Sequence, residues 1–332
     1  MREPAFWWRA AGLEAALLAP LAAGYGAIAA RRMAREGARA AIPVLCVGNF
    51  TLGGAGKTPT VIALAQMLEA SGRRPGFLTR GYKGSVAGPH VVDALHDRAS
   101  DVGDEALLLA RVAPTVVARD HVAGAAIARA QGADVVLMDD GLQNGSLKKD
   151  FTLAVVDGRR GIGNARVFPA GPLRAPLAAQ LDHTDAMLVV GDGDGADNVI
   201  KAAKERDLPV FHARLVSDHA AIADLKARKV LAFAGIGDPE KFFASATEAG
   251  LTIARRRAFP DHHRFTAEEA AELTMAAEHE GLALITTEKD RARMAGEPLL
   301  AALAARVHVL PVRMIVQEAD ALRQTMLAAL KR

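Results

Sequence analysis

The strongest structural signal in this chain is the run Thr51-Leu52-Gly53-Gly54-Ala55-Gly56-Lys57-Thr58. It follows an apolar run at 44–47 and leads into a helical pattern that starts near Thr60. A strand, a glycine-rich turn ending in Lys-Thr and a helix together form a phosphate cradle, because backbone N–H groups and the helix N-terminus face an anion. In such a cradle the lysine reaches the terminal phosphates and the hydroxyl ligates Mg²⁺. We therefore expect residues 53–58 to bind ATP, with Lys57 and Thr58 at the phosphates and the metal.

One position departs from the usual pattern of these loops. The usual pattern has glycine six residues before the lysine, and this chain has Thr51 there. The strand before the loop and the helix after it still favour a nucleotide site.

Short apolar runs alternate with helical stretches through the first two thirds of the chain. After the loop, these runs lie at 75–78, 115–118, 135–138, 151–156 and 186–190. Because the runs are continuously apolar, they predict an α/β fold of the P-loop NTPase type, with a mostly parallel sheet flanked by helices. Ligands of such sheets bind at the C-terminal ends of the strands, where residues 53–58, Arg80 and Asp139 fall.

A second, smaller α/β unit begins near Ala223. It has apolar runs at 230–234, 282–286 and 307–312, and a capping-box pair at Thr266 and Glu269 marks the start of one of its helices. We expect an N-terminal helical segment at 1–36, a P-loop core domain at 37–222, and a smaller domain at 223–332 that closes over the site.

Composition describes a globular protein rather than a nucleic-acid binder. Of the 332 residues 51% are hydrophobic and 24% are charged, and the net charge is only +3. The single cysteine, Cys46, excludes an intramolecular disulfide and a metal site built from several cysteines. A reducing, cytoplasmic setting fits this composition.

The N-terminal segment has the composition of a membrane-docking helix. Residues 10–30 carry one charge, Glu14, and arginines flank them on both sides. Tryptophan favours the headgroup level of a membrane, and arginine favours anionic lipid. Pro20 and the equal basic flanks give no orientation for a spanning helix, and a secretory signal conflicts with the nucleotide site downstream. We favour monotopic docking over a helix packed on the core domain or a spanning helix. The docking side chains are expected to be Trp7, Trp8, Leu17, Leu18 and Leu21.

Two adjacent carboxylates follow the apolar run at 135–138. Asp139 has the usual position of the carboxylate that holds Mg²⁺ beside a phosphate loop. Asp140 comes next, and alternation along a strand would point it elsewhere, so the two carboxylates are expected to have different roles. A turn favoured only for its geometry is the alternative.

Two further charged motifs are ambiguous from their spacing alone. Asp104 and Glu105 precede a helix, where carboxylates complement the helix dipole, or one of them acts as a base toward an acceptor hydroxyl. His262 and His263 lie in a loop of the second unit, and adjacent histidines rarely converge on one metal ion.

Together these motifs resemble one family, the tetraacyldisaccharide 4′-kinases that make lipid A in Gram-negative bacteria. The resemblance covers nearly the whole chain and rests on the combination of motifs. These include Phe6-Trp7-Trp8-Arg9, Val47-Gly48-Asn49, residues 53–59, Thr79-Arg80-Gly81-Tyr82, Val102-Gly103-Asp104-Glu105, Asp139-Asp140-Gly141-Leu142-Gln143, Pro169-Ala170-Gly171-Pro172-Leu173-Arg174, Asp261-His262 and Thr287-Glu288-Lys289-Asp290.

The resemblance implies transfer of the ATP γ-phosphate to the 4′-hydroxyl of tetraacyldisaccharide 1-phosphate at the cytoplasmic face of the inner membrane. Under it, the expected partners are the membrane-embedded lipid acceptor and the anionic membrane surface, with no nucleic acid. It also implies that Asp104 is the base, supported by His262, that Asp140 is the partner of Asp139, and that Lys57 and Thr58 act at phosphate and Mg²⁺. Polar positions that line the site would be Glu105, Gln143, Arg174 and Arg80.

Two positions differ from the family pattern. Asn144 stands where the family usually has histidine, and Ala175 where it often has glutamate. A membrane-associated switch ATPase is the main rival, because its loop is also Gly-Gly-x-Gly-Lys-Thr. That class carries a lysine where this chain has Leu52, and it leaves Asp104 and His262 unexplained. A nucleotide sensor without turnover is a third reading.

Overall fold

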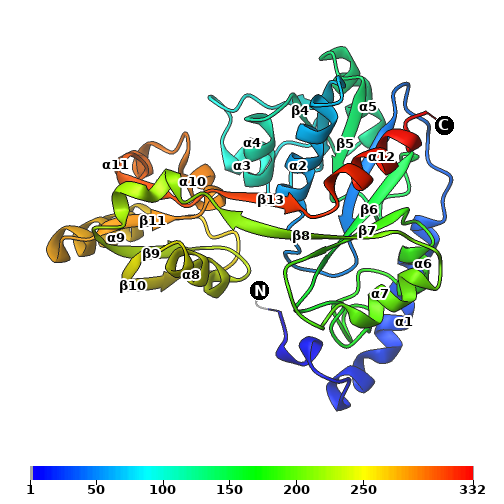
Figure 1. Cartoon of the computed structure of the whole chain (residues 1–332), viewed down its shortest axis with the longest axis horizontal. Helices are drawn as coiled ribbons and strands as arrows, with labels where there is room; N and C mark the ends of the chain where they lie inside the picture. Colours follow the sequence, from blue (N-terminus) through cyan, green and yellow to red (C-terminus); the bar gives the residue numbers. More distant parts are fainter. Residues whose placement is uncertain (1–2, 332) are drawn as a thin grey trace.

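A nine-stranded, mostly parallel sheet forms the centre of the computed structural model, which describes residues 3–331 (Figure 1). Its strand order is β13-β8-β7-β6-β1-β5-β2-β4-β3, and the two edge pairings, β13 with β8 and β3 with β4, are antiparallel. The strands are β1 (Val44–Asn49), β2 (Pro75–Thr79), β3 (His90–Val91), β4 (Thr115–Val117), β5 (Val135–Asp139), β6 (Phe151–Asp157), β7 (Ala186–Val190), β8 (Val210–Ser217) and β13 (Val312–Val316). The predicted fold class is confirmed.

Helices cover both faces of this sheet. Leu45 and Val47 of β1 pack with α2 (Lys57–Glu69) and α12 (Ala319–Ala329) on one face, while Val44 and Cys46 pack with α5 (His121–Ala130) on the other. Successive side chains of β1 therefore enter the hydrophobic cores on opposite faces of the sheet. The remaining helices of this unit are α3 (Ala99–Val102), α4 (Asp104–Ala110), α6 (Leu177–Leu181) and α7 (Asp197–Lys204).

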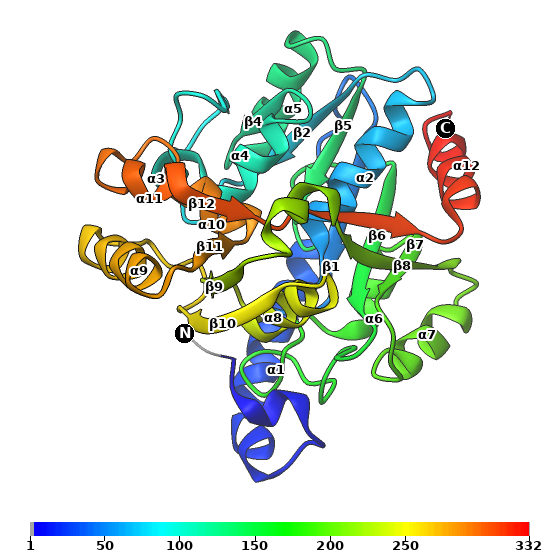
Figure 2. The same cartoon turned by 60° about the vertical axis from the view of Figure 1, so that its left-hand side comes forward.

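The second unit is built around a four-stranded parallel sheet (Figure 2). Its strand order is β10-β9-β11-β12, and the strands are β9 (Lys229–Ala234), β10 (Thr252–Ala258), β11 (Ala283–Thr286) and β12 (Val307–Val309). Its helical elements are η2 (Ala220–Leu225), α8 (Pro239–Glu248), α9 (Ala267–Glu280), α10 (Glu288–Met294), η3 (Pro298–Leu300) and α11 (Ala301–Arg306). The predicted capping box at Thr266 and Glu269 is present at the start of α9.

The predicted C-terminal boundary of the second domain, at residue 332, is wrong. Strand β13 and helix α12 leave the second unit and return to the large sheet, where Met314, Leu322 and Met326 join its core. The chain therefore crosses between the two units twice, through β8 into η2 and through β12 into β13. The apolar run at 307–312 is consequently split between two sheets.

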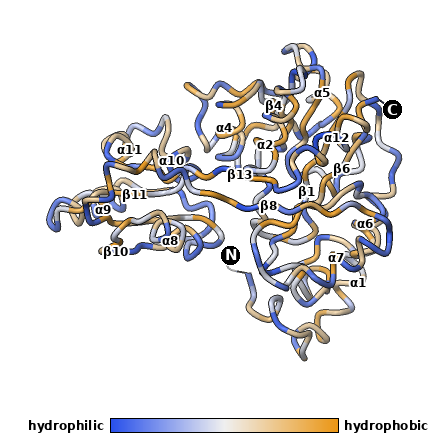
Figure 3. Tube along the Cα trace, in the orientation of Figure 1, coloured by the Kyte–Doolittle hydropathy of each residue, from blue (hydrophilic) through white to orange (hydrophobic). Residues whose placement is uncertain are grey.

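The N-terminal segment forms η1 (Ala5–Trp8) and α1 (Leu13–Met33), and α1 projects from the body of the protein (Figure 1). Four residues of α1 are buried, and Leu13, Leu17 and Leu21 are 74%, 71% and 65% exposed. By length and composition α1 could cross a membrane. Figure 3 marks hydrophobic residues along this projecting helix, and the exposure of its leucines places apolar surface on its outside.

Candidate active site

The phosphate loop lies between β1 and α2, at the C-terminal edge of the large sheet. Gly53 and Gly56 adopt φ of 100° and 86°, a left-handed backbone that glycine accepts without a Cβ penalty. Thr51, the departure from the usual pattern, instead forms a β-bridge with Leu173. That position takes part in backbone pairing, so the missing glycine does not disturb the cradle.

The ammonium group of Lys57 contacts side chains at the ends of two strands, Asn49 of β1 and Asp140 just after β5. Its Nζ lies 3.1 Å from Asn49 Oδ1 and 3.7 Å from Asp140 Oδ1. Burial lowers the pKa of Lys57, and Asp140 opposes that shift. Arg174 donates to Asp140 Oδ1 at 2.8 Å, so two cations share this carboxylate. Although burial would raise it, the pKa of Asp140 is lowered by Lys57 and Arg174.

Asp139 is a buried carboxylate with an oxygen that lacks a hydrogen-bond partner among the described residues. It ends β5, is buried, and its Oδ1 is the one fully enclosed side-chain polar atom without a partner in residues 3–331. Burial, followed by the nearby charges of Glu105 and Asp140, raises the pKa of Asp139 to about 7. Thr58 lines the same cavity as Asp139. A carboxylate oxygen without a donor and a hydroxyl oxygen on one cavity wall suit a hard cation, so the residues present fit Mg²⁺.

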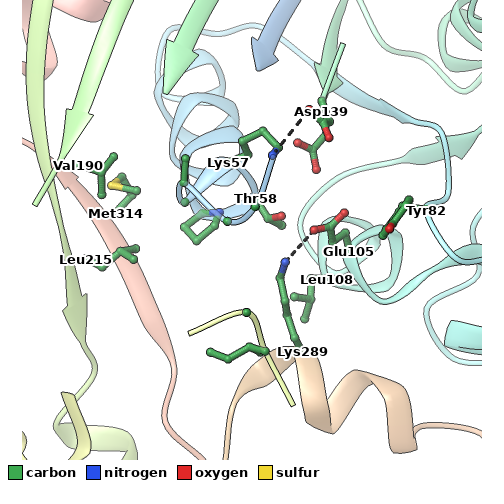
Figure 4. Close-up of a pocket in the computed structure, with 18 of the residues that line it drawn as sticks. Lys57, Thr58, Tyr82, Glu105, Leu108, Asp139, Val190, Leu215, Lys289 and Met314 are labelled. Carbon is green, nitrogen blue, oxygen red and sulfur yellow. Dashed lines mark hydrogen bonds and ion pairs between the residues drawn. The ribbon is translucent and has the colours of Figure 1, made fainter. Parts of the chain in front are cut away.

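Two ion pairs join α4 of the first unit to α10 of the second. Lys289 Nζ lies 2.7 Å from Glu105 Oε1, and Arg293 Nε donates to Asp104 Oδ2 at 2.9 Å. Figure 4 shows the Lys289 ammonium pointing toward Glu105, with Thr58 on the near side of this pair and Tyr82 beyond Glu105. Although burial would raise it, the pKa of Asp104 lies well below its ordinary value because His262 and Arg293 favour the ionised form.

Asp104 and His262 are brought together as a pair. His262 Nδ1 lies 3.4 Å from Asp104 Oδ1, across the junction of the two units. His262 lines the large cavity beside the phosphate loop, whereas Asp104 lies behind it and lines a smaller adjoining pocket. Both Asp140 and His262 have positive φ, 60° and 54°. Such backbone is uncommon for residues with side chains and clusters at functional sites.

One cavity of about 1650 Å³ connects these groups. Its wall includes the phosphate loop, Asp139, Asp140, Glu105 and His262. It extends to Tyr25, Ile28 and Arg32 of α1 and to Arg35 just after that helix. Arg80, Gln143 and Arg174, the polar positions that the resemblance implied for the site, also line this cavity. Gln143 donates to the Asn49 carbonyl at 2.8 Å, which ties the loop after β5 to β1.

The predicted membrane residues divide into two groups. Leu17 and Leu21 are exposed and Leu18 is half-buried, which suits contact with lipid. Trp7 is 5% exposed and donates to the Pro169 carbonyl at 3.1 Å, so assigning it to lipid contact is wrong. Trp8 donates to Glu3 and lies under the Arg160 guanidinium. Both indoles anchor η1 to the protein.

Sequence reasoning missed the cations of α10. From the sequence, residues 287–290 are only a motif of the resemblance, with no role assigned. Lys289 and Arg293 lie four apart on one face of a helix and reach Glu105 and Asp104. Their spacing is a usable signal, because residues i and i+4 share a helix face. Only the packing of the two units identifies their partners.

The fold and the site define a P-loop protein whose phosphate cradle faces buried carboxylates. The sequence profile of the family "Tetraacyldisaccharide-1-P 4′-kinase" matches residues 14–331. The chain belongs to this family. A tetraacyldisaccharide 4′-kinase of Methylobacterium radiotolerans is 56% identical over 99% of both chains. One of Rhodopseudomonas palustris is 53% identical over 98% of this chain and 96% of the relative.

A solved structure shares the architecture. The "apo" form of LpxK from Aquifex aeolicus in complex with ATP superposes with a TM-score of 0.74 and covers 95% of this chain and 99% of that one, at 24% identity. At that identity the likeness supports the fold.

Proposed function

We propose that this protein transfers the γ-phosphate of ATP to the 4′-hydroxyl of tetraacyldisaccharide 1-phosphate. The observation that carries the proposal is one cavity lined by both the phosphate loop and the C-terminal half of the apolar helix α1. A soluble nucleotide and a lipid acceptor can meet only where two such surfaces share one space. Membership of the family supports the same reaction.

The nucleotide phosphates would lie on residues 53–58, with Lys57 and Arg174 at the transferred group. Thr58 and Asp139 would hold Mg²⁺, which, when bound, neutralises phosphoryl charge. Phosphoryl transfer depends mainly on positioning and on stabilising charge, since the transition state is loose. The ion pair of Lys57 with Asp140 keeps that ammonium directed at the cradle before ATP arrives.

The acceptor hydroxyl must lose a proton, and Asp104 with His262 is the proposed pair that takes it. His262 supplies the face of the pair that lies on the cavity, and Asp104 is the ionised carboxylate behind it. A carboxylate behind an imidazole orients the ring and stabilises its protonated form. Arg293 keeps Asp104 ionised, so the pair depends on contact between the two units.

Helix α1 is the proposed membrane contact, at the cytoplasmic face of the inner membrane. Its outward leucines would enter the headgroup boundary, and Arg31, Arg32 and Arg35 follow at its end, where anionic lipid would attract them. An acceptor with four acyl chains stays in the bilayer, so a docked α1 brings the cavity to it. The proposed association is peripheral, with the lipid A precursor as partner.

The test is transfer of γ-labelled phosphate from ATP to tetraacyldisaccharide 1-phosphate in detergent, with Mg²⁺ present. Label in the lipid, lost in Lys57→Ala and retained in the exposed control Lys331→Ala, is the expected result. ATP hydrolysis with no labelled lipid would favour the switch ATPase instead. ATP binding with no turnover of either kind would favour the nucleotide sensor.

A further inference from the structure

His121 and Asn144 form a polar pair at the end of the cavity that adjoins α1. His121 is the first residue of α5, and Asn144 lies in the loop after β5, one residue beyond Gln143. His121 is 4% exposed, and both residues line the large cavity. In a buried histidine on a cavity wall, the ring nitrogen that carries the proton determines which atom can donate to a ligand.

The hydrogen bonds around Asn144 settle that question. The backbone N–H of Ser146 donates to Asn144 Oδ1 at 2.7 Å, so the amide Nδ2 must be the atom that faces His121 Nδ1 at 2.6 Å. An amide N–H only donates, which makes His121 Nδ1 the acceptor. In the neutral ring the proton is therefore on Nε2.

Nε2 is the ring nitrogen left to face the cavity that His121 lines, because Nδ1 is hydrogen-bonded to Asn144. It has no hydrogen-bond partner in residues 3–331, and it is not fully enclosed, because Asp139 Oδ1 is the one enclosed side-chain atom there without a partner. Burial, followed by the charges of Arg80 and Lys149, lowers the pKa of His121 to about 4. The ring thus presents a neutral N–H donor of fixed tautomer to the cavity at pH 7.

The donor shares its cavity with three arginines, and the charge of one of them, Arg80, acts on the His121 ring. Arg80, Arg32 and Arg35 line the same cavity. The loop that carries Asn144 abuts the end of α1, since a Cβ on Gly145 would lie 2.2 Å from the Arg32 carbonyl oxygen. This end of the cavity therefore lies beside the C-terminal end of α1. Its groups suit an anion that carries several acceptor oxygens.

We propose that His121, held by Asn144, donates its Nε2–H to the anomeric phosphate of the lipid acceptor, with Arg80 as the charged partner. The proposal rests on the proposed function, because that function supplies the phosphorylated acceptor. A neutral N–H donor of fixed tautomer would orient the phosphate, while the arginines supply positive charge. It would align the acceptor so that its other end reaches the phosphate loop.

The kinetic test compares His121→Leu, His121→Gln and the exposed control His183→Leu, using acceptors with and without the anomeric phosphate. With the phosphorylated acceptor, loss of one hydrogen bond to a charged group should raise the acceptor KM of His121→Leu about 10-fold and leave the ATP KM unchanged. The glutamine amide reaches a similar place and should restore most of the loss. With the dephosphorylated acceptor, His121→Leu and the wild type should be alike.

An unchanged acceptor KM in His121→Leu, or an equal loss with both acceptors, would overturn the proposal. Imidazole ¹⁵N spectra give a readout that does not need turnover. The His121 signals, assigned by their absence in His121→Gln, should show a neutral Nε2–H ring at pH 7 and shift when the phosphorylated acceptor is added. Wild-type protein that shows this shift without transferring phosphate would refute the kinase reaction and leave the binding site standing. Spectra unmoved by the acceptor would refute the site.

Discussion

At the scale of single residues, the site combines two carboxylates in opposite environments. Asp139 has an enclosed oxygen without a hydrogen-bond partner in the described part of the chain, and Asp104 has two partners. Asp139 lacks a donor, and its pKa is raised to about 7. Asp104 is paired with Arg293 and with His262, and its pKa is lowered. Groups whose environments push their pKa values apart have different chemical tasks, which fits a metal ligand at Asp139 and a permanently charged partner at Asp104.

Asp139 should make Mg²⁺ binding dependent on pH. Because its folded-state pKa is raised to about 7, the carboxyl must lose a proton to bind the metal below pH 7. We expect the affinity for Mg²⁺ in the presence of ATP to weaken by up to about 10-fold for each pH unit below 7. Calorimetric titration between pH 5.5 and 8.5 measures it, and a flat profile in that range would contradict the raised pKa.

Asp139→Asn should separate stability from activity. The raised pKa means that the folded state binds this proton more tightly than the unfolded state, so ionisation of Asp139 costs stability as pH rises from about 4 to about 7. At pH 8 without metal, the neutral amide should raise the free energy of unfolding by roughly 1–3 kcal/mol. Transfer activity should be lost. Denaturant unfolding checks the first effect, with Asp194→Asn in an exposed turn as the matched control, and an unchanged or lower stability would count against it.

Asp104 and His262 should behave as one unit in catalysis. We expect Asp104→Asn and His262→Gln each to lower kcat roughly 100-fold or more with little change in the KM for ATP, and the double variant to be no slower than the slower single variant. Steady-state kinetics of the three variants measure this. A large rise in the ATP KM with normal kcat would refute the role of Asp104. Thermal unfolding of each variant checks that loss of the Arg293 ion pair has not destabilised the fold.

At the scale of elements, α1 is an apolar helix that the rest of the chain leaves uncovered. Its leucines at 13, 17 and 21 face outward, while η1 is fixed to the protein by Trp7 and Trp8. Because η1 is anchored at one end and Met33 is buried at the other, α1 is held in a set direction. The helix therefore presents its apolar face at a defined angle to the cavity.

Replacing the exposed leucines of α1 should release the protein from membranes. For Leu17→Ser with Leu21→Ser we expect binding to anionic liposomes to fall at least about 10-fold, since each leucine contributes roughly 1 kcal/mol or more on burial. Co-sedimentation measures it. Leu95→Ser with Leu299→Ser is the matched control, because those leucines are 86% and 78% exposed on other segments. Equal loss in both double variants would mean that α1 is not the docking surface.

At the scale of the whole molecule, the chain crosses twice between two units that also share side-chain contacts. Arg293 with Asp104 and Lys289 with Glu105 join them beside the cavity, and Arg159 with Asp238 at 2.7 Å joins them on another side. Closure of the second unit over ATP would form or break these pairs together. The position of the second unit is therefore linked to the chemistry of the site.

The return of α12 to the large unit has a consequence for stability. Met326 is fully buried in the core formed with α2, so Met326→Ala should cost roughly 2–5 kcal/mol of unfolding free energy. Met275→Ala on α9, where the side chain is 59% exposed, is the matched control and should cost little. Denaturant unfolding followed by two probes, one in each unit, locates the effect. Loss confined to the second unit would contradict the observed return.

The sequence by itself determined the elements that depend on short-range patterns. The loop at 53–58, the strand that ends at Asp139 and the capping box at Thr266 were all readable, because glycine geometry, apolar runs and helix caps act over a few residues. The order of strands and helices around the loop then identified the fold class, and the combination of motifs indicated the family.

Only the tertiary structure decided which distant groups meet. Arg293 reaches Asp104 across 189 positions, Asn144 fixes the ring of His121, and Trp7 is buried rather than in contact with lipid. β13 joins the large sheet although its sequence follows directly after the second unit. These outcomes depend on how whole units pack, because a side chain carries no local signal of a partner that the fold brings to it from far along the chain.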